Sequence, residues 1–396
     1  MKELFLVLKR NHWILLLVLA SFALTEAVKD MKVFTVAGAF LFVWAVASNI
    51  NLTKEITGRV ILIVFMFLVY LLLGETGFNV QHFVHHIVPI CTLYMLGRAL
   101  VKKNNDETYY VGLLLTVALC CGLFDIVITA KDISEYGLVN MDIFSYEFHV
   151  QERDEEWVAT SLRAAEFASL ISCLILFFIS SGNSKIRHLK LLGSILSVIA
   201  VLCALHFVSR SAIVVAAVVV VIGVLYKMFQ GQRNVVWILI GLGVVLLLLT
   251  QSDLWKLMEY KNETTDLATG NNRVESLMLW AQRVSEHPFG TPDWQNYYRP
   301  FAHNFWLDFA KVAGWVPAIC LVVFSLLNVR DVIRVNKNKF IPSNVRIMVV
   351  AMAVAFILAY SVEPIFDGTK NGVYVYFFFC GIVSAFAEIK RPVALE

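Results

Sequence analysis

Three polar sites in the second half of the chain have residue types that could hold an anion and move a proton. Arg210 stands between two serines, Arg273 follows a Gly-Asn-Asn sequence, and His303 is followed directly by Asn304. An arginine fork binds phosphate oxygens in pairs. A histidine can accept a hydroxyl proton near neutral pH. These residues predict phosphate binding at the two arginines and general-base catalysis at His303.

Four aromatic residues lie between Arg273 and His303: Trp280, Trp294, Tyr297 and Tyr298. Their flat rings offer large apolar surfaces with a polar edge, and we expect them to stack on sugar faces. An anion site, a neutral base and sugar-binding rings at a membrane face together suggest transfer of a glycan from a lipid phosphate.

Arg210 belongs to the only polar break between two long apolar runs, 190–208 and 212–229. The connection is so short that its guanidinium must lie at or just inside the membrane boundary. A charge at that depth is costly unless paired, so it favours a functional role. The alternative is that the side chain reaches the lipid headgroups.

Arg273 opens a predicted helix over 272–286. Pro288 and Gly290 end the pattern of apolar residues. The apolar residues that recur at helical spacing are Val274, Leu277, Met278, Ala281 and Val284. An arginine in the first turn opposes the helix dipole, unless a bound anion lies between it and the free amides. The alternative is an exposed arginine neutralised by Glu275.

His303 precedes an apolar run, with Asn304 beside it and Asp308 about one and a half turns further on. Asn304 and Asp308 are accessory candidates. A loop histidine often has no function, and that reading stays open here.

The composition, 59% hydrophobic and 16% charged, excludes an ordinary soluble domain. Hydropathy predicts an all-α polytopic membrane protein with about twelve transmembrane helices. We place the spans near 12–26, 32–50, 59–74, 83–101, 109–129, 160–181, 190–208, 212–229, 234–250, 310–328, 345–361 and 372–388. Residues 1–396 form a single transmembrane domain in this prediction, and 251–313 form one large outer-side loop that carries the site.

Most Lys and Arg residues fall in alternate connectors and at the two ends of the chain. The positive-inside rule therefore places both termini in the cytoplasm and the 251–313 loop on the outer side. We expect no nucleic-acid partner.

Other charged residues are weaker candidates. Arg163 and Glu166 are spaced to pair on one helix face, and Arg163 is a further accessory candidate. Glu26 and Asp30, one helical turn apart, only loosely match an acidic metal site. The chain predicts no metal centre and no cofactor.

The chain resembles the bacterial O-antigen ligase and O-antigen polymerase superfamily. The resemblance rests on Ser-Arg-Ser-Ala at 209–212, on Asn-Asn-Arg-Val-Glu-Ser-Leu at 271–277 with His-Pro-Phe-Gly at 287–290, and on His-Asn-Phe-Trp-Leu at 303–307. It covers mainly residues 190–330, where the three motifs occur in order around one large outer loop.

The resemblance implies a metal-independent, inverting membrane glycosyltransferase of the GT-C type in the bacterial inner membrane, with the 251–313 loop in the periplasm. Its donor would be a glycan linked to undecaprenyl diphosphate, held by Arg210 and Arg273, with His303 as the base. A ligase would transfer the glycan to lipid A–core, and a polymerase to another lipid-linked repeat unit. Family members often carry a glutamate after the His-Asn pair, and here Asp308 is the nearest acid.

We favour the ligase over the polymerase. A polysaccharide transporter of about twelve spans is the alternative from another class, although it would be expected to show internal symmetry and interrupted spans. A non-catalytic scaffold is the third reading, and it gives no account of Arg210.

Overall fold

The computed structural model describes residues 52–74, 80–103, 106–136, 167–179, 184–206, 209–231, 273–291, 302, 304–362 and 370–390. Within these ranges the secondary structure is helical and contains no strands, in agreement with the predicted all-α class. The predicted spans near 12–26, 32–50 and 234–250 lie outside the described residues.

The helices include one short 3-10 element before α4 and another after α8. In chain order they are η1 (Leu52–Glu55), α4 (Gly58–Leu73), α5 (Val80–Lys103), α6 (Glu107–Tyr136), α8 (Phe167–Ile171), η3 (Ser172–Phe178), α9 (Ser184–His206), α10 (Arg210–Phe229), α13 (Arg273–Glu286), α14 (Phe305–Ala313), α15 (Trp315–Lys337), α16 (Ser343–Val362) and α18 (Lys370–Phe386). Among the described residues, α9, α10, α15 and α16 are long and apolar enough to cross a membrane.

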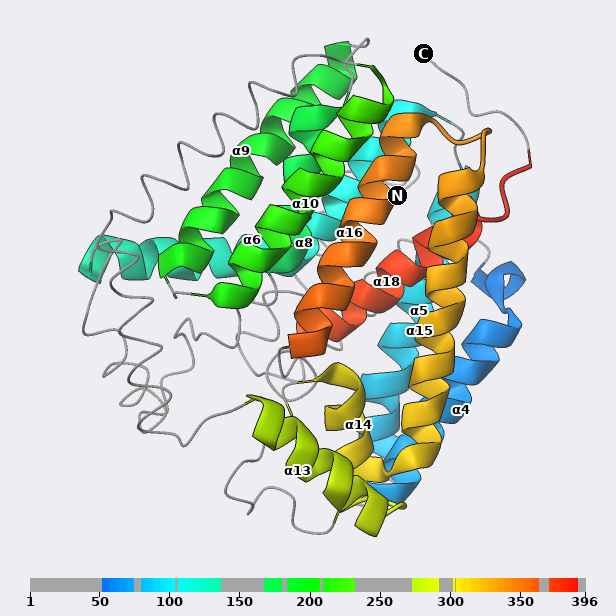
Figure 1. The fold of residues 1–396 in the computed structure, drawn as a ribbon. Coiled ribbons are helices and arrows are strands. Elements are labelled where there is room, and N and C mark those ends of the chain that lie inside the picture. The colour runs from blue at the N-terminus through cyan, green and yellow to red at the C-terminus, as the bar shows by residue number, and fades with distance from the viewer. Residues whose placement is uncertain are drawn as a thin grey trace, which may run out of the picture.

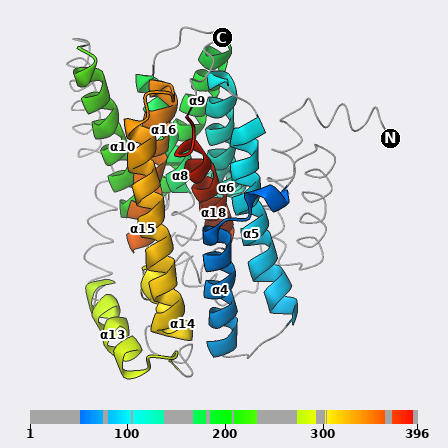
Figure 2. The ribbon, with the colours of Figure 1, turned by 90° about the vertical axis from the view of Figure 1, so that its right-hand side faces the viewer.

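The helices pack side by side as a bundle, with α16 and α18 between two groups (Figure 1). One group contains α4, α5 and α15, and the other contains α6, α8, α9 and α10. The view turned by 90° in Figure 2 shows α13 and α14 together at one end of this bundle. Helix α18 lies tightly against α5 because Gly97 and Gly381 face the partner backbone, where a Cβ would overlap a carbonyl oxygen.

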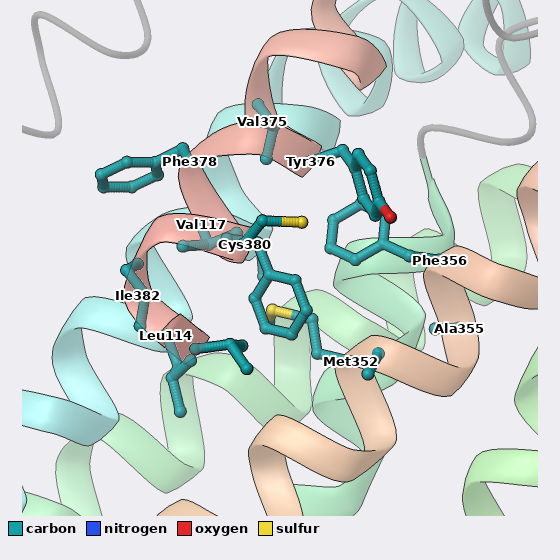
Figure 3. Packing of buried hydrophobic residues seen from close by; sticks show 14 of the residues in the cluster. Leu114, Val117, Met352, Ala355, Phe356, Val375, Tyr376, Phe378, Cys380 and Ile382 are labelled. Carbon is teal, nitrogen blue, oxygen red and sulfur yellow. The ribbon is translucent and has the colours of Figure 1, made fainter. Parts of the chain in front are cut away.

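The buried core between α6, α16 and α18 consists of large apolar and aromatic side chains (Figure 3). Leu114 of α6 and Met352 of α16 are buried in it. The rings of Phe356 and Tyr376 lie 5.9 Å apart between centroids in an edge-on arrangement. Aromatic pairs at this separation add stability beyond their buried area, so this core fixes α16 against α18.

One end of the bundle is held by ion pairs around the buried Arg98 and Glu55. Arg98 near the end of α5 pairs with Glu55 at 3.0 Å and with Glu388 at 2.8 Å, and Lys102 pairs with the same Glu55 at 2.7 Å. We call this the charged end. Helices α6 and α16 begin there, since Asn344 Nδ2 donates to Glu107 Oε1 at 2.9 Å. Helix α16 therefore ends at the opposite end of the bundle.

Helix α10 begins at that opposite end. Helix α9 runs from the charged end in the same direction as α6, because positions Gly112 and Leu189 lie side by side and so do Leu115 and Gly193. The connection from α9 to α10 is short, and the Ser209 N–H donates to the Ala204 carbonyl in the last turn of α9 at 3.0 Å. The first residue of α10 and the last turn of α16 thus lie at the same end.

Candidate functional site

Asn304 forms the N-cap of α14. Its backbone is extended, and its side-chain oxygen accepts the Leu307 N–H at 3.1 Å. The same side chain donates through Nδ2 to the carbonyl of Ser361, in the last turn of α16, at 3.3 Å. One asparagine therefore both caps α14 and fixes its start to the end of α16.

Asp308 holds the backbone on both sides of His303. Its Oδ1 accepts the Ala302 N–H at 2.7 Å, and its Oδ2 accepts the Asn304 N–H at 3.3 Å. The carboxylate is fully buried, where such charge-assisted hydrogen bonds are strong. His303 itself lies outside the described residues. The two bonds fix the residues that flank it in the chain.

Lys311 is a site residue that the sequence analysis did not identify. Its Nζ lies 3.3 Å from Asp308 Oδ1, and both side chains have an exposed fraction of 0%. The same Nζ lies 5.5 Å from the ring centroid of Trp280 on α13, within the range of a cation–π contact. Buried charges are costly unless paired. The sequence signal was a lysine three residues after an aspartate within an otherwise apolar helix.

The prediction that Trp280 is an open platform for a sugar is wrong. Trp280 is 0% exposed, and Ser276 and Val284, one turn away on either side, are buried with it. Met278, counted among the apolar residues of the predicted pattern, is 65% exposed. Trp280 thus packs α13 onto Lys311 of α14. Trp294, Tyr297 and Tyr298 lie outside the described residues.

The predicted span over 310–328 is wrong in its start. The chain instead breaks at Gly314, so that α14 ends at Ala313 and α15 begins at Trp315. Gly314 has φ +79°, a conformation that favours glycine, and a Cβ there would overlap the Pro288 carbonyl oxygen. Close packing of Gly314 against the Pro288 backbone therefore requires glycine at the break between α14 and α15.

The turn after α13 is bonded to the same break. The Trp315 N–H donates to the Pro288 carbonyl at 3.0 Å, and the Thr291 N–H donates to the Lys311 carbonyl at 2.9 Å. Helices α13 and α14 therefore meet at their C-terminal ends. Helix α13, Arg273–Glu286, agrees with the predicted helix over 272–286.

The two arginines are the first residues of their helices. Arg210 opens α10, whose N-cap Ser209 accepts the Ala212 N–H at 3.4 Å and exchanges a hydrogen bond with Ser211 at 3.0 Å. Arg273 opens α13. The side chains of both arginines lie outside the described residues, as does Arg163 entirely.

The structure places the starts of α10 and α14 at the same end of the bundle, with α13 packed against α14. Helix starts carry free N–H groups and a partial positive charge, which suit an anion. Among the described residues, no three His, Cys, Asp or Glu side chains are grouped as metal ligands.

No protein-family model matches this chain, and no curated protein is significantly similar to it. Its function is therefore inferred from residue patterns and from the geometry of the described residues.

Proposed function

We propose that this protein is a GT-C-type membrane glycosyltransferase, an O-antigen ligase that moves a glycan from undecaprenyl diphosphate to lipid A–core. The observation that carries the proposal is the buried Asp308 carboxylate, which binds the backbone N–H groups on both sides of His303. Bonds to Ala302 and Asn304, at the end of the bundle where α10 begins, suit an intervening residue that must be held in one position.

The reaction requires a base and an anion site. An acceptor hydroxyl oxygen attacks the anomeric carbon of the donor sugar, and the bond from that carbon to the diphosphate oxygen breaks with inversion. His303 takes the hydroxyl proton, and undecaprenyl diphosphate leaves with the electron pair. Arg210 and Arg273 neutralise the charge that develops on the leaving diphosphate. The scheme needs no metal ion and no cofactor.

Asp308 acts as a positioning residue in this scheme. A general base is effective only within hydrogen-bond reach of the proton that it accepts, and small displacements of a reacting group are costly. Lys311 balances the Asp308 charge and contacts Trp280, so it couples the helix that Arg273 opens to the carboxylate that binds Ala302 and Asn304.

The distribution of charge supports a periplasmic site in an inner-membrane protein. Arg59, Arg98 and Lys102 gather at the charged end, where Arg59 pairs with Asp331. Asn304 and the start of α10 lie at the other end. The positive-inside rule counts Lys and Arg, so the charged end lies in the cytoplasm. The proposed site then faces the periplasm, both termini are cytoplasmic, and the twelve predicted spans surround the site.

The test is the glycan profile of a strain from which this gene is deleted. A ligase predicts loss of polymer on lipid A–core, with polymer still present on the carrier lipid. A single repeat unit on the core would identify a polymerase instead. Lipid-linked units accumulating on the cytoplasmic side would identify a transporter and overturn the proposal.

A further inference from the structure

A cavity of about 220 Å³ lies among α14, α15, α16 and α18, and we call it the α15–α16 crevice. Its lining is almost entirely apolar and aromatic. The lining residues are Trp306, Val322, Ser325, Leu326, Asn328, Val329, Ala353, Ile357, Tyr376 and Phe379.

The crevice begins beside the candidate site and runs toward the charged end. Trp306, in its wall, is two residues after the Asn304 cap. On α16 the wall includes Ile357, one turn from the Ser361 carbonyl that Asn304 binds. On α15 it extends from Val322 to Val329, which is roughly 10 Å along a helix. The cavity is thus elongated along the bundle axis.

The crevice is open on the outer surface of the bundle. Val322, Leu326 and Ile357 line it and are exposed, and α15 and α16 are two of the helices long enough to cross a membrane. Inside it, Ser325 Oγ is engaged by Trp306 Nε1 at 3.0 Å and by the Tyr376 hydroxyl at 3.4 Å. If α15 and α16 span the membrane, the mouth opens toward the lipid chains of the bilayer.

We propose that the α15–α16 crevice binds the first isoprene units of the polyprenyl diphosphate donor. The identity of the donor rests on the proposed function; the location rests on the crevice. In the proposed reaction the donor sugar lies beside His303, which directly precedes the Asn304 cap of α14, so the donor chain begins on the side of Trp306. The crevice continues from there along α15 toward the charged end. Because lipid surroundings are already apolar, selectivity depends on shape and packing rather than on the hydrophobic effect.

The first experiment locates the lipid without requiring transfer. The full chain is reconstituted in vesicles of phosphatidylethanolamine and phosphatidylglycerol with an isoprenyl diphosphate that carries a diazirine in its second isoprene unit. We expect labelling of the segments 315–337 and 343–362. It should fall about tenfold with unlabelled isoprenyl diphosphate at about ten times its Kd, and should not respond to added phosphatidylglycerol.

A matched pair of variants makes this test specific. Val322 and Val323 are neighbours with exposed fractions of 41% and 42%, but only Val322 lines the crevice. Val322→Trp should reduce labelling about tenfold, equivalent to about 1.4 kcal/mol, and should raise KM for a long-chain donor more than for a short donor whose polyprenyl chain is replaced by an ethyl group, which does not fill the crevice. Val323→Trp should leave both unchanged. Ile357→Trp tests the opposite wall should Val322→Trp fail to fold.

Equal effects of Val322→Trp and Val323→Trp would overturn the proposal, as would labelling competed equally by phosphatidylglycerol. An equal loss with long and short donors would also overturn it, because that pattern marks damage to the site rather than to chain binding. Specific labelling of the crevice in a wild-type protein that transfers no glycan would refute the proposed function. The crevice would still be a binding site for an isoprenyl chain.

Discussion

Substituting the buried pair of Asp308 and Lys311 should affect stability and transfer activity differently. Both side chains are fully buried, and their charged atoms lie 3.3 Å apart. Removing one partner of such a pair costs roughly 3–5 kcal/mol, because the other charge stays in a medium that solvates it poorly. Domains have a free energy of unfolding of about 5–15 kcal/mol. Asp308→Asn and Lys311→Met should therefore each lower the unfolding temperature strongly.

The double variant should recover much of that stability, because replacing both charges of a buried pair is often nearly neutral. It should not recover transfer. An asparagine at position 308 has one side-chain oxygen, which can accept one of the two backbone N–H groups. Its NH2 group is a donor and cannot accept the other N–H group. One of the two bonds that flank His303 is then lost. Misplacing a reacting group by an ångström costs about a hundredfold in rate.

The assay compares unfolding temperature, donor affinity and kcat for wild type, both single variants and the double variant in the same detergent. Donor affinity in the double variant should stay close to wild type. Recovery of kcat together with stability would refute the positioning role, since Asp308 would then serve only to balance the charge of Lys311.

Three further predictions follow from the fold and from the proposed chemistry. Gly314→Ala should lower the unfolding temperature markedly, because its Cβ would overlap the Pro288 carbonyl, whereas Gly58→Ala has open space and should be tolerated; similar melting of the two variants would contradict the packing. Transfer by purified protein should persist in excess EDTA, and loss restored by Mg²⁺ would contradict the metal-independent scheme. Reporter fusions at Asn183 should read cytoplasmic and at Asn262 periplasmic; a cytoplasmic signal at Asn262 would put the site on the wrong side.

Local sequence patterns predicted the helices better than they predicted what the helices pack against. Helix α13 was predicted within one residue, because apolar spacing and the Pro288 stop are local signals. The buried face of α13 was not predicted, because Trp280 contacts Lys311, a residue on another helix. Hydropathy could not show which ring would be covered.

The break at Gly314 was missed for a similar reason. The residues on both sides are apolar, so a hydropathy window runs across them as one span. The break depends on the positive φ of Gly314 and on contact with Pro288, more than twenty residues earlier. Asp308 was predicted only as an accessory acid, and its bonds to Ala302 and Asn304 depend on how the chain before α14 folds back onto that helix.

The most direct test of the proposed function measures donor-lipid affinity beside transfer rate for three purified variants. Arg210→Lys and Arg273→Lys keep the charge but lose the fork, so each should impair transfer by about ten- to a hundredfold through loss of a contact worth roughly 1.5–3 kcal/mol. His303→Ala should bind the donor like wild type and lose roughly 10²–10⁴-fold in rate. Loss of donor binding in His303→Ala while both arginine variants retain it, or full activity in all three, would contradict the proposed site.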